Sequence, residues 1–168
     1  MESHVFEIYI KTTPERLWQA ITDPEQRAKY SFGVKVYSDW TPGSSYESKA
    51  SWGPIVEDNE GPIDISVGEN LEVDPPHRLV QTFNAMWADE VRAEPTSRVT
   101  WEIAQVGTSC RLTVIHDEIR DGANNQIYGG WPMILSGLKT LLETGELLDT
   151  PGSLQYLGNE DAGLPVSD

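Results

Sequence analysis

Residues 130–145 read GWPMILSGLKTLLETG, and this stretch predicts an apolar helix near the end of the chain. Leu135, Leu138 and Leu142 recur at spacings of three and four residues, which is the period of one helix face. The stretch closes on a glycine, a residue type that commonly ends helices. We predict a helix over residues 125–144. Its proline lacks an amide hydrogen, so either the regular part of the helix starts beside the proline or the helix is kinked there. We expect this helix to pack its apolar face against the rest of the chain.

The region before this helix alternates between apolar and polar residues in short runs that are separated by turn residues. Alternation with a period of two is typical of half-buried strands, and consecutive runs without intervening helices favour antiparallel pairing. Two longer loops, over residues 53–62 and 86–97, are of a length common in lids and binding segments. We predict strands over residues 5–11, 34–40, 45–52, 63–73, 78–84, 98–106 and 110–116.

Two short helices are predicted between the first and second strands. Thr13 and Pro14 supply an N-cap hydroxyl and a proline in the first helical turn. Asp23 followed by Pro24 repeats the signal, and Gln26 stands three residues after the cap. The order of elements is therefore strand, two helices, six strands and one long helix, which is an α+β chain.

The length of 168 residues fits one domain, which we place over residues 1–148. Residues 149–168 differ in composition, with many Gly, Pro, Ser and acidic residues. Such a segment has few apolar groups to bury, so we expect an acidic, flexible C-terminal tail.

Several strings resemble the START/SRPBCC superfamily, in its heat-shock-protein-90 ATPase activator homologue-like branch. They are FEIYI (6–10), TPERLW (13–18), TDPE (22–25), LTVIH (112–116), and the closing helix quoted above. The resemblance implies a helix-grip (START/Bet v-like) fold, in which a seven-stranded curved antiparallel sheet surrounds the C-terminal helix and leaves a cavity. It implies no single activity, because members hold lipids, hormones or polyketides, catalyse cyclisations, or contact a chaperone.

The net charge, the length of the apolar runs and the cysteine content exclude several classes of function. A net charge of −15 should repel phosphate backbones and anionic membranes, so we expect no nucleic-acid partner. No apolar run approaches the roughly 18 residues that a membrane helix needs. The single cysteine, Cys110, cannot form an internal disulfide, and no leader pattern opens the chain, so we expect a cytoplasmic protein.

Large aromatic side chains are the strongest local signal for a binding site. Rings with one polar tip suit a pocket that holds an apolar or aromatic small molecule, and the same rings could simply fill the core. We expect them to converge between the sheet and the last helix, around an uncharged or weakly polar ligand. The predicted ligand-binding residues are Tyr30, Trp40, Tyr46, Trp52, Phe83, Trp87, Trp101, His116, Tyr128, Trp131 and Leu135.

His116 is the histidine placed by the strand pattern, on the face that carries Leu112 and Val114. It could hydrogen-bond a ligand or carry a proton, or it could be a satisfied structural group. The sequence shows no ligand spacing for a metal, no phosphate-cradling loop and no dinucleotide fingerprint. We therefore expect no metal and no cofactor.

Three functions follow, in the order in which the sequence favours them. The first is binding of an apolar or aromatic small molecule in an internal cavity. The second is an enzyme of the cyclase or hydrolase type in the same cavity, with His116 and Tyr46 or Tyr128 as acid–base groups; no paired nucleophile and base supports it. The third is a co-chaperone-like interaction domain. The sequence leaves open whether the chain forms a homodimer.

Overall fold

The computed structural model describes residues 1–51 and 61–150 of the chain. The predicted ligand residue Trp52 and most of the predicted tail lie outside these residues. The described elements are β1 (Glu2–Ile10), α1 (Pro14–Thr22), α2 (Pro24–Ala28), β2 (Lys35–Ser38), β3 (Ser45–Ala50), β4 (Ile63–Asp74), β5 (Arg78–Ala85), α3 (Asp89–Arg92), β6 (Ser97–Val106), β7 (Ser109–Ile119), a 3-10 turn (Asn125–Ile127) and α4 (Trp131–Thr144).

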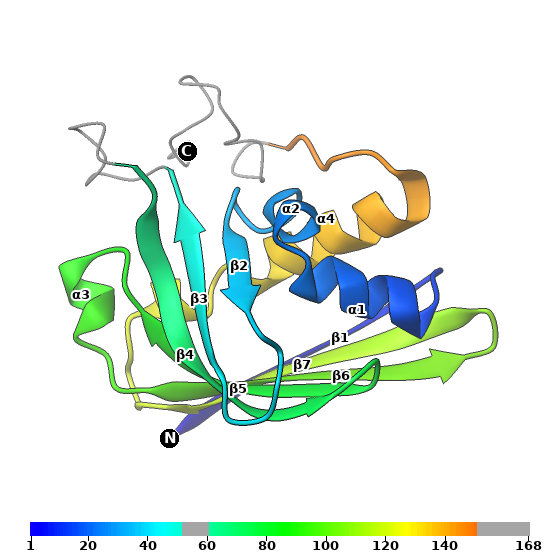
Figure 1. The fold of residues 1–168 in the computed structure, drawn as a ribbon. Helices are drawn as coiled ribbons and strands as arrows, with labels where there is room; N and C mark the ends of the chain where they lie inside the picture. The colour runs from blue at the N-terminus through cyan, green and yellow to red at the C-terminus, as the bar shows by residue number, and fades with distance from the viewer. Residues whose placement is uncertain (52–60, 151–168) are drawn as a thin grey trace.

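The strands form one seven-stranded sheet in the order β1-β7-β6-β5-β4-β3-β2, and every neighbouring pair is antiparallel. Helices α1, α2 and α4 lie on one side of this sheet, which curves towards them (Figure 1). β1 and β2 are the two edges, so segments that are neighbours in the first quarter of the chain lie at opposite ends of the sheet. The predicted α+β helix-grip fold with a seven-stranded curved sheet is confirmed.

The predicted N-caps of the two short helices are present. The Thr13 hydroxyl accepts a hydrogen bond from the amide of Arg16 (3.2 Å), and the Asp23 carboxylate accepts one from the amide of Gln26 (2.9 Å). Each bond satisfies an amide that the first turn of a helix leaves without a partner. The two caps mark the starts of α1 and α2, which follow β1 and lie on the side towards which the sheet curves (Figure 1).

The C-terminal helix begins at Trp131 and ends where the glycine signal predicted. The amide of Gly145 donates to Leu141 (2.8 Å), and Gly145 has a φ of 76°, a conformation that glycine adopts without a steric penalty. The segment 125–127 forms a separate 3-10 turn rather than the first turn of α4. Of the two alternatives that Pro132 left open, a regular helix that starts beside it is the one observed. Helix α3, inside the second long loop, was not predicted.

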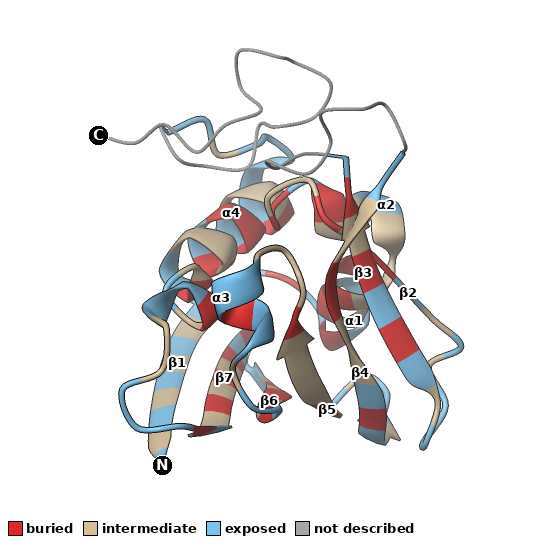
Figure 2. Cartoon of the chain, turned by 90° about the vertical axis from the view of Figure 1, so that its left-hand side faces the viewer, coloured by how far each residue is buried: buried red, intermediate tan, exposed pale blue. Residues whose placement is uncertain are grey.

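The main hydrophobic core lies between the sheet and the helices. Its fully buried members include Trp101 on β6, Leu112 on β7, Leu17 and Ile21 on α1, and Leu138 on α4. Buried and exposed residues alternate along the strands, as the bands in Figure 2 show. None of the helices in residues 1–51 and 61–150 is long and apolar enough to cross a membrane.

Candidate functional site

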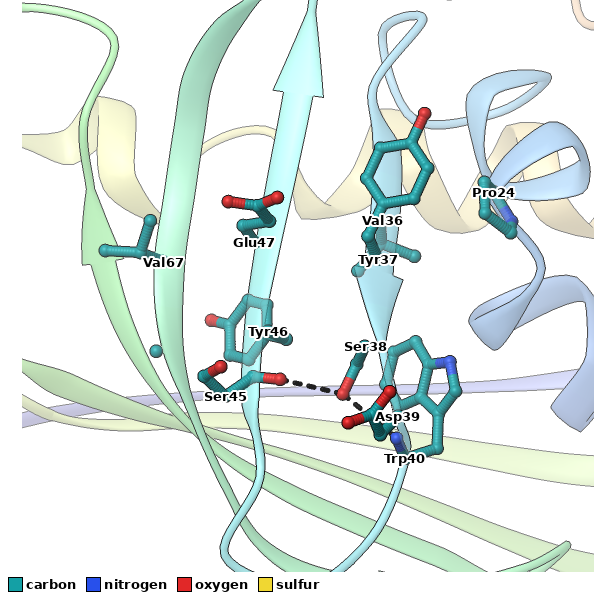
Figure 3. A pocket seen from close by; sticks show the side chains of 11 residues that line it. Pro24, Val36, Tyr37, Ser38, Asp39, Trp40, Ser45, Tyr46, Glu47 and Val67 are labelled. Carbon is teal, nitrogen blue, oxygen red and sulfur yellow. Dashed lines mark hydrogen bonds between the residues drawn. The ribbon is translucent and has the colours of Figure 1, made fainter.

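An open pocket lies at the β2 edge of the sheet, beside the start of α2 (Figure 3). Its volume is about 720 Å³, within the range of small-molecule sites. Two of the predicted ligand residues, Trp40 and Tyr46, line it. The full lining consists of Pro24, Val36, Tyr37, Ser38, Asp39, Trp40, Ser45, Tyr46, Glu47, Val67 and Gly68. No residue of α4 is among them, so this pocket is not the space between sheet and α4 where the sequence led us to expect one.

Tyr46 is held firmly across the neighbouring strand. Its hydroxyl donates a hydrogen bond to the carbonyl of Thr82 on β5 (2.7 Å), so the side chain reaches over β4. Gly68 on β4 makes room for this path, because a Cβ there would meet the Thr82 carbonyl and would lie 2.7 Å from Cε1 of Tyr46. Burial raises the pKa of the Tyr46 phenol above its ordinary value, so the group stays neutral. Tyr46 therefore offers the pocket a fixed aromatic wall.

Trp40 forms a wall between the pocket and the core, since it lines the pocket and packs against the main hydrophobic cluster. Trp40, which follows β2, has a φ of 54°, and Phe32, which precedes β2, has the same value. Bulky residues seldom adopt this left-handed conformation, and it persists only where the surroundings impose it. Phe32 also packs against the main cluster. Both ends of β2 thus hold an aromatic ring against the core at a cost in backbone energy.

A buried polar network lies behind the pocket and fixes the chain that carries Trp40. The amide nitrogen of Asn70, which is fully buried, donates to the hydroxyls of Ser38 (2.8 Å) and Ser44 (3.0 Å). Gln81 on β5 donates to the Asn70 side-chain oxygen (2.9 Å). The Ser38 hydroxyl in turn accepts a bond from the amide of Trp40 (3.0 Å; Figure 3). Satisfied networks of this kind make a local structure rigid.

His116 is fully buried, and both of its ring nitrogens have partners inside the protein. The indole nitrogen of Trp131 donates to Nδ1 (3.2 Å), so Nδ1 carries no hydrogen, and the proton of the neutral ring is on Nε2. Nε2 therefore donates to the hydroxyl of Ser97 (2.7 Å). Burial lowers the pKa of His116 from its ordinary 6.5 to about 4, with a smaller effect of the same sign from His4. In this state His116 is a neutral group that joins β7, β6 and α4.

The rings around His116 pack closely against one another. Trp101 meets Trp131 edge to face with centroids 5.2 Å apart, and Phe83 meets His116 in the same manner, also at 5.2 Å. Leu135 is buried in the same cluster. The predicted residues of the sheet centre and of α4 therefore do converge, as direct packing partners.

Three other predicted residues have other stacking or hydrogen-bond partners, although Tyr30 belongs to the main cluster and Tyr128 packs against it. Tyr128 stacks on His4 beside β1, with centroids 4.0 Å apart. Trp87 packs against two smaller clusters, and its indole nitrogen donates to Gln126 (3.4 Å). Tyr30 is fully buried under α1, where its hydroxyl donates to the carbonyl of Ala20 (2.7 Å), and burial raises its pKa to about 12.

Arg27 on α2 is a partly buried residue that we did not predict. Its guanidinium carbon lies 4.9 Å from the centroid of the Trp101 ring, and its Nη1 donates to the carbonyl of Ile21 (3.0 Å). Its positive charge also lowers the pKa of Tyr30 and Tyr46, against the larger effect of burial. Arg27 is thus a cation between the helix layer and the aromatic face of the sheet. Within the described residues, no group of three His, Cys, Asp or Glu side chains is placed to hold a metal ion.

Comparison with known families supports the resemblance seen in the sequence. The family model described as activator of Hsp90 ATPase homolog 1-like protein matches residues 11–143, which is most of the chain. The chain belongs to this family. A search of curated proteins found no match.

Solved structures of similar fold come from diverse organisms. Protein MLL2253 from Mesorhizobium loti is 26% identical over 87% of this chain and 100% of its own, with a TM-score of 0.65. PFC0360w, an HSP90 activator from Plasmodium falciparum, is 21% identical over 83% of this chain and 95% of its own (TM-score 0.64). CalU16 from Micromonospora echinospora is 18% identical over 94% of this chain and 74% of its own (TM-score 0.65). At these identities, the last two similarities establish the fold alone.

Proposed function

We propose that this protein binds an apolar or aromatic small molecule, with the pocket at the β2 edge as the place of entry. The observation that carries the proposal is a pocket of about 720 Å³ with one wall formed by Trp40, whose ring also packs against the main aromatic core. Pockets of this size with rigid aromatic walls and a few polar groups are typical of small-molecule sites. In this proposal the ligand lies against Trp40 and Tyr46 and extends towards the space between the sheet and α4.

The fixed geometry around the pocket also supports a binding role. Tyr46 is anchored to Thr82, and the network through Asn70 and Ser38 anchors Trp40. A site that is rigid before binding loses less conformational entropy when a ligand arrives. Natural proteins place strained and rigid residues of this kind at ligand sites more often than elsewhere.

The enzyme of the cyclase or hydrolase type is our alternative, and the site residues favour it less. His116, the acid–base candidate, uses both ring nitrogens within the protein, and its pKa of about 4 keeps it neutral at physiological pH. Burial keeps the Tyr46 phenol protonated. Neither group is therefore free to exchange a proton with a bound substrate in this arrangement.

A co-chaperone-like role is the third candidate, and it is motivated by PFC0360w, the HSP90 activator of similar fold. A homodimer is a further proposal, because the Aha1 protein from Colwellia psychrerythraea, also of similar fold, forms a dimer. We also propose a cytoplasmic location, which the single free thiol of Cys110 supports.

Titration with phenylnaphthylamine, an uncharged fluorescent probe, tests the binding proposal. We expect one saturable site on the native protein and a loss of affinity of about fivefold or more in Trp40→Ala, since a large apolar contact is removed. Tyr9→Ala is the matched control, because Tyr9 is an exposed aromatic residue on β1 at the opposite edge of the sheet. Absence of saturable binding, or equal losses in both variants, would remove the basis of the proposal.

A further inference from the structure

The side chain of Arg27 turns into the domain instead of into solvent. Its Nε–H is shielded from solvent and has no hydrogen-bond partner, although Nη1 is bound to the carbonyl of Ile21. The guanidinium lies over the Trp101 ring at 4.9 Å, where it gains a cation–π contact. A cation–π contact supplies no hydrogen-bond acceptor, so the Nε–H of Arg27 remains without one.

The charge of Arg27 has no carboxylate partner among the described residues. The sequence contains seven arginines, all within the described ranges. Arg78, Arg92, Arg98 and Arg120 form ion pairs, while Arg16 and Arg111 are exposed to solvent. Within residues 1–51 and 61–150, Arg27 is therefore the one arginine that is partly buried and has no carboxylate partner. Charges that are removed from water are normally paired, so the partly buried and unpaired Arg27 is a candidate contact for an anion.

A second donor without a partner belongs to the ring that the guanidinium contacts. The indole N–H of Trp101 is buried and unpaired, and only 1% of this residue is exposed. The nearby phenols of Tyr30 and Tyr46 donate to backbone carbonyls, so they do not neutralise the arginine. The interior around Arg27 thus combines a positive charge with two unused N–H donors and three aromatic rings.

We propose that the ligand is an organic acid with an aromatic or alicyclic body, bound with its carboxylate on Arg27 Nε and Trp101 Nε1. This inference rests on the proposed binding function and specifies its ligand class. A carboxylate fits the planar fork of a guanidinium and accepts charge-assisted bonds from it. The ring of the acid would lie towards Trp40 and Tyr46, beside Pro24, the residue through which α2 borders the pocket. Arg27 and Trp101 do not themselves line this pocket, so the carboxylate would have to pass behind the wall that Trp40 forms. The uncharged ligand that we expected from the sequence is replaced by an anion.

The overall charge of the protein makes this inference easy to test. A net charge of −15 disfavours anions at the surface, so nonspecific association should select uncharged compounds. Surface charges are screened within about 10 Å at 0.1 M salt, whereas a buried contact is screened far less. A preference for the anion that survives added salt would therefore have to arise from a local, buried cation.

The experiment measures displacement of anilinonaphthalene sulfonate from the full-length protein by two competitors of equal shape. Naphthoate carries a carboxylate, and naphthamide carries a neutral amide in the same place. We expect naphthoate to displace the dye at a concentration at least about tenfold lower, and we expect this ratio to persist in high salt. Equal potency of the two compounds would overturn the inference, and this test needs no variant. Equal potency is expected if water alone hydrogen-bonds to Arg27 Nε and Trp101 Nε1.

Variants of Arg27 assign the preference to one residue. Arg27→Met should reduce the naphthoate ratio to about one, and Arg27→Lys should keep part of it, because an ammonium retains the charge without the planar fork. Arg16→Met is the control, since Arg16 is an exposed arginine on α1, and it should keep the wild-type ratio.

Affinity for phenylnaphthylamine, the same dye without its sulfonate, separates this inference from the proposed function. Arg27→Met should still bind this probe at one saturable site, and its circular dichroism spectrum shows whether the variant is folded. If phenylnaphthylamine binds and naphthoate shows no advantage, the binding function stands and the anion inference is wrong. If phenylnaphthylamine does not bind the wild-type protein, the binding function itself fails.

Discussion

Acidification should destabilise this protein, because burial makes the ring of His116 harder to protonate in the folded state. In the folded protein the pKa of His116 is about 4, against an ordinary value of 6.5. Between these values the unfolded chain binds a proton that the native chain cannot bind, so the free energy of unfolding falls as the pH falls. The slope is about 1.4 kcal/mol per pH unit, which gives a total loss of about 3 kcal/mol between pH 6.5 and 4 and no further loss below.

Urea unfolding at pH 7, 6, 5 and about 4.5 measures this loss, with His116→Asn as the comparison. The asparagine oxygen can still accept the bond from Trp131, and its side chain does not titrate. The variant should be less stable at pH 7, and the difference between wild type and variant should shrink as the pH falls. This subtraction removes the contribution of the 27 acidic residues, which the two proteins share.

His77→Asn is the control for the loss of an exposed imidazole, and it should keep the wild-type dependence on pH because His116 is still present. A difference between wild type and His116→Asn that stays constant from pH 7 to pH 4.5 would refute the reasoning. It would mean that the buried ring accepts a proton as easily as it does in the unfolded chain.

Three further substitutions test the frame around the pocket by urea unfolding at neutral pH. Gly68→Ala should lower the free energy of unfolding by about 1–3 kcal/mol, because its Cβ has no room beside the Thr82 carbonyl; a change near zero would show that β4 and β5 can separate. Tyr46→Phe should cost about 1 kcal/mol through the lost bond to Thr82, and an unchanged stability would mean that water replaces the hydroxyl. Asn70→Ala should cost about 2–4 kcal/mol, since it leaves the buried Gln81 amide without its acceptor; a surface-like effect below about 0.5 kcal/mol would contradict this.

The order of elements could be predicted because it depends on local signals. Thr13 and Asp23 cap the short helices through hydrogen bonds to residues three positions later in the sequence. Alternation of apolar and polar residues marks the strands wherever one face is buried. The sequence does not separate the 3-10 turn at Asn125–Ile127 from α4, since the apolar spacing continues through it. Helix α3 gives no periodic pattern, because Asp89–Arg92 is a single turn with one buried residue, Val91.

The candidate site could be predicted only in part. Aromatic content indicates that rings will meet, but it cannot tell which of them become packing partners, such as Trp101 and Trp131, and which line a pocket, such as Trp40. Arg27 gave no signal, because a charged residue on a five-residue helix normally points to solvent. Its inward direction depends on where α2 lies relative to β6, and that position follows from tertiary packing alone.

A crystal structure of the protein with naphthoate tests the central claim most directly. We predict that the ligand lies between Trp40 and Tyr46, with its carboxylate within hydrogen-bond distance of Arg27 Nε. The Tyr46 ring should change little in position, since its hydroxyl bond to Thr82 already holds it, and the backbone of Trp40 should stay in place through its bond to Ser38. Naphthoate bound elsewhere on the protein, or a pocket without ligand at a concentration that saturates binding in solution, would contradict the claim.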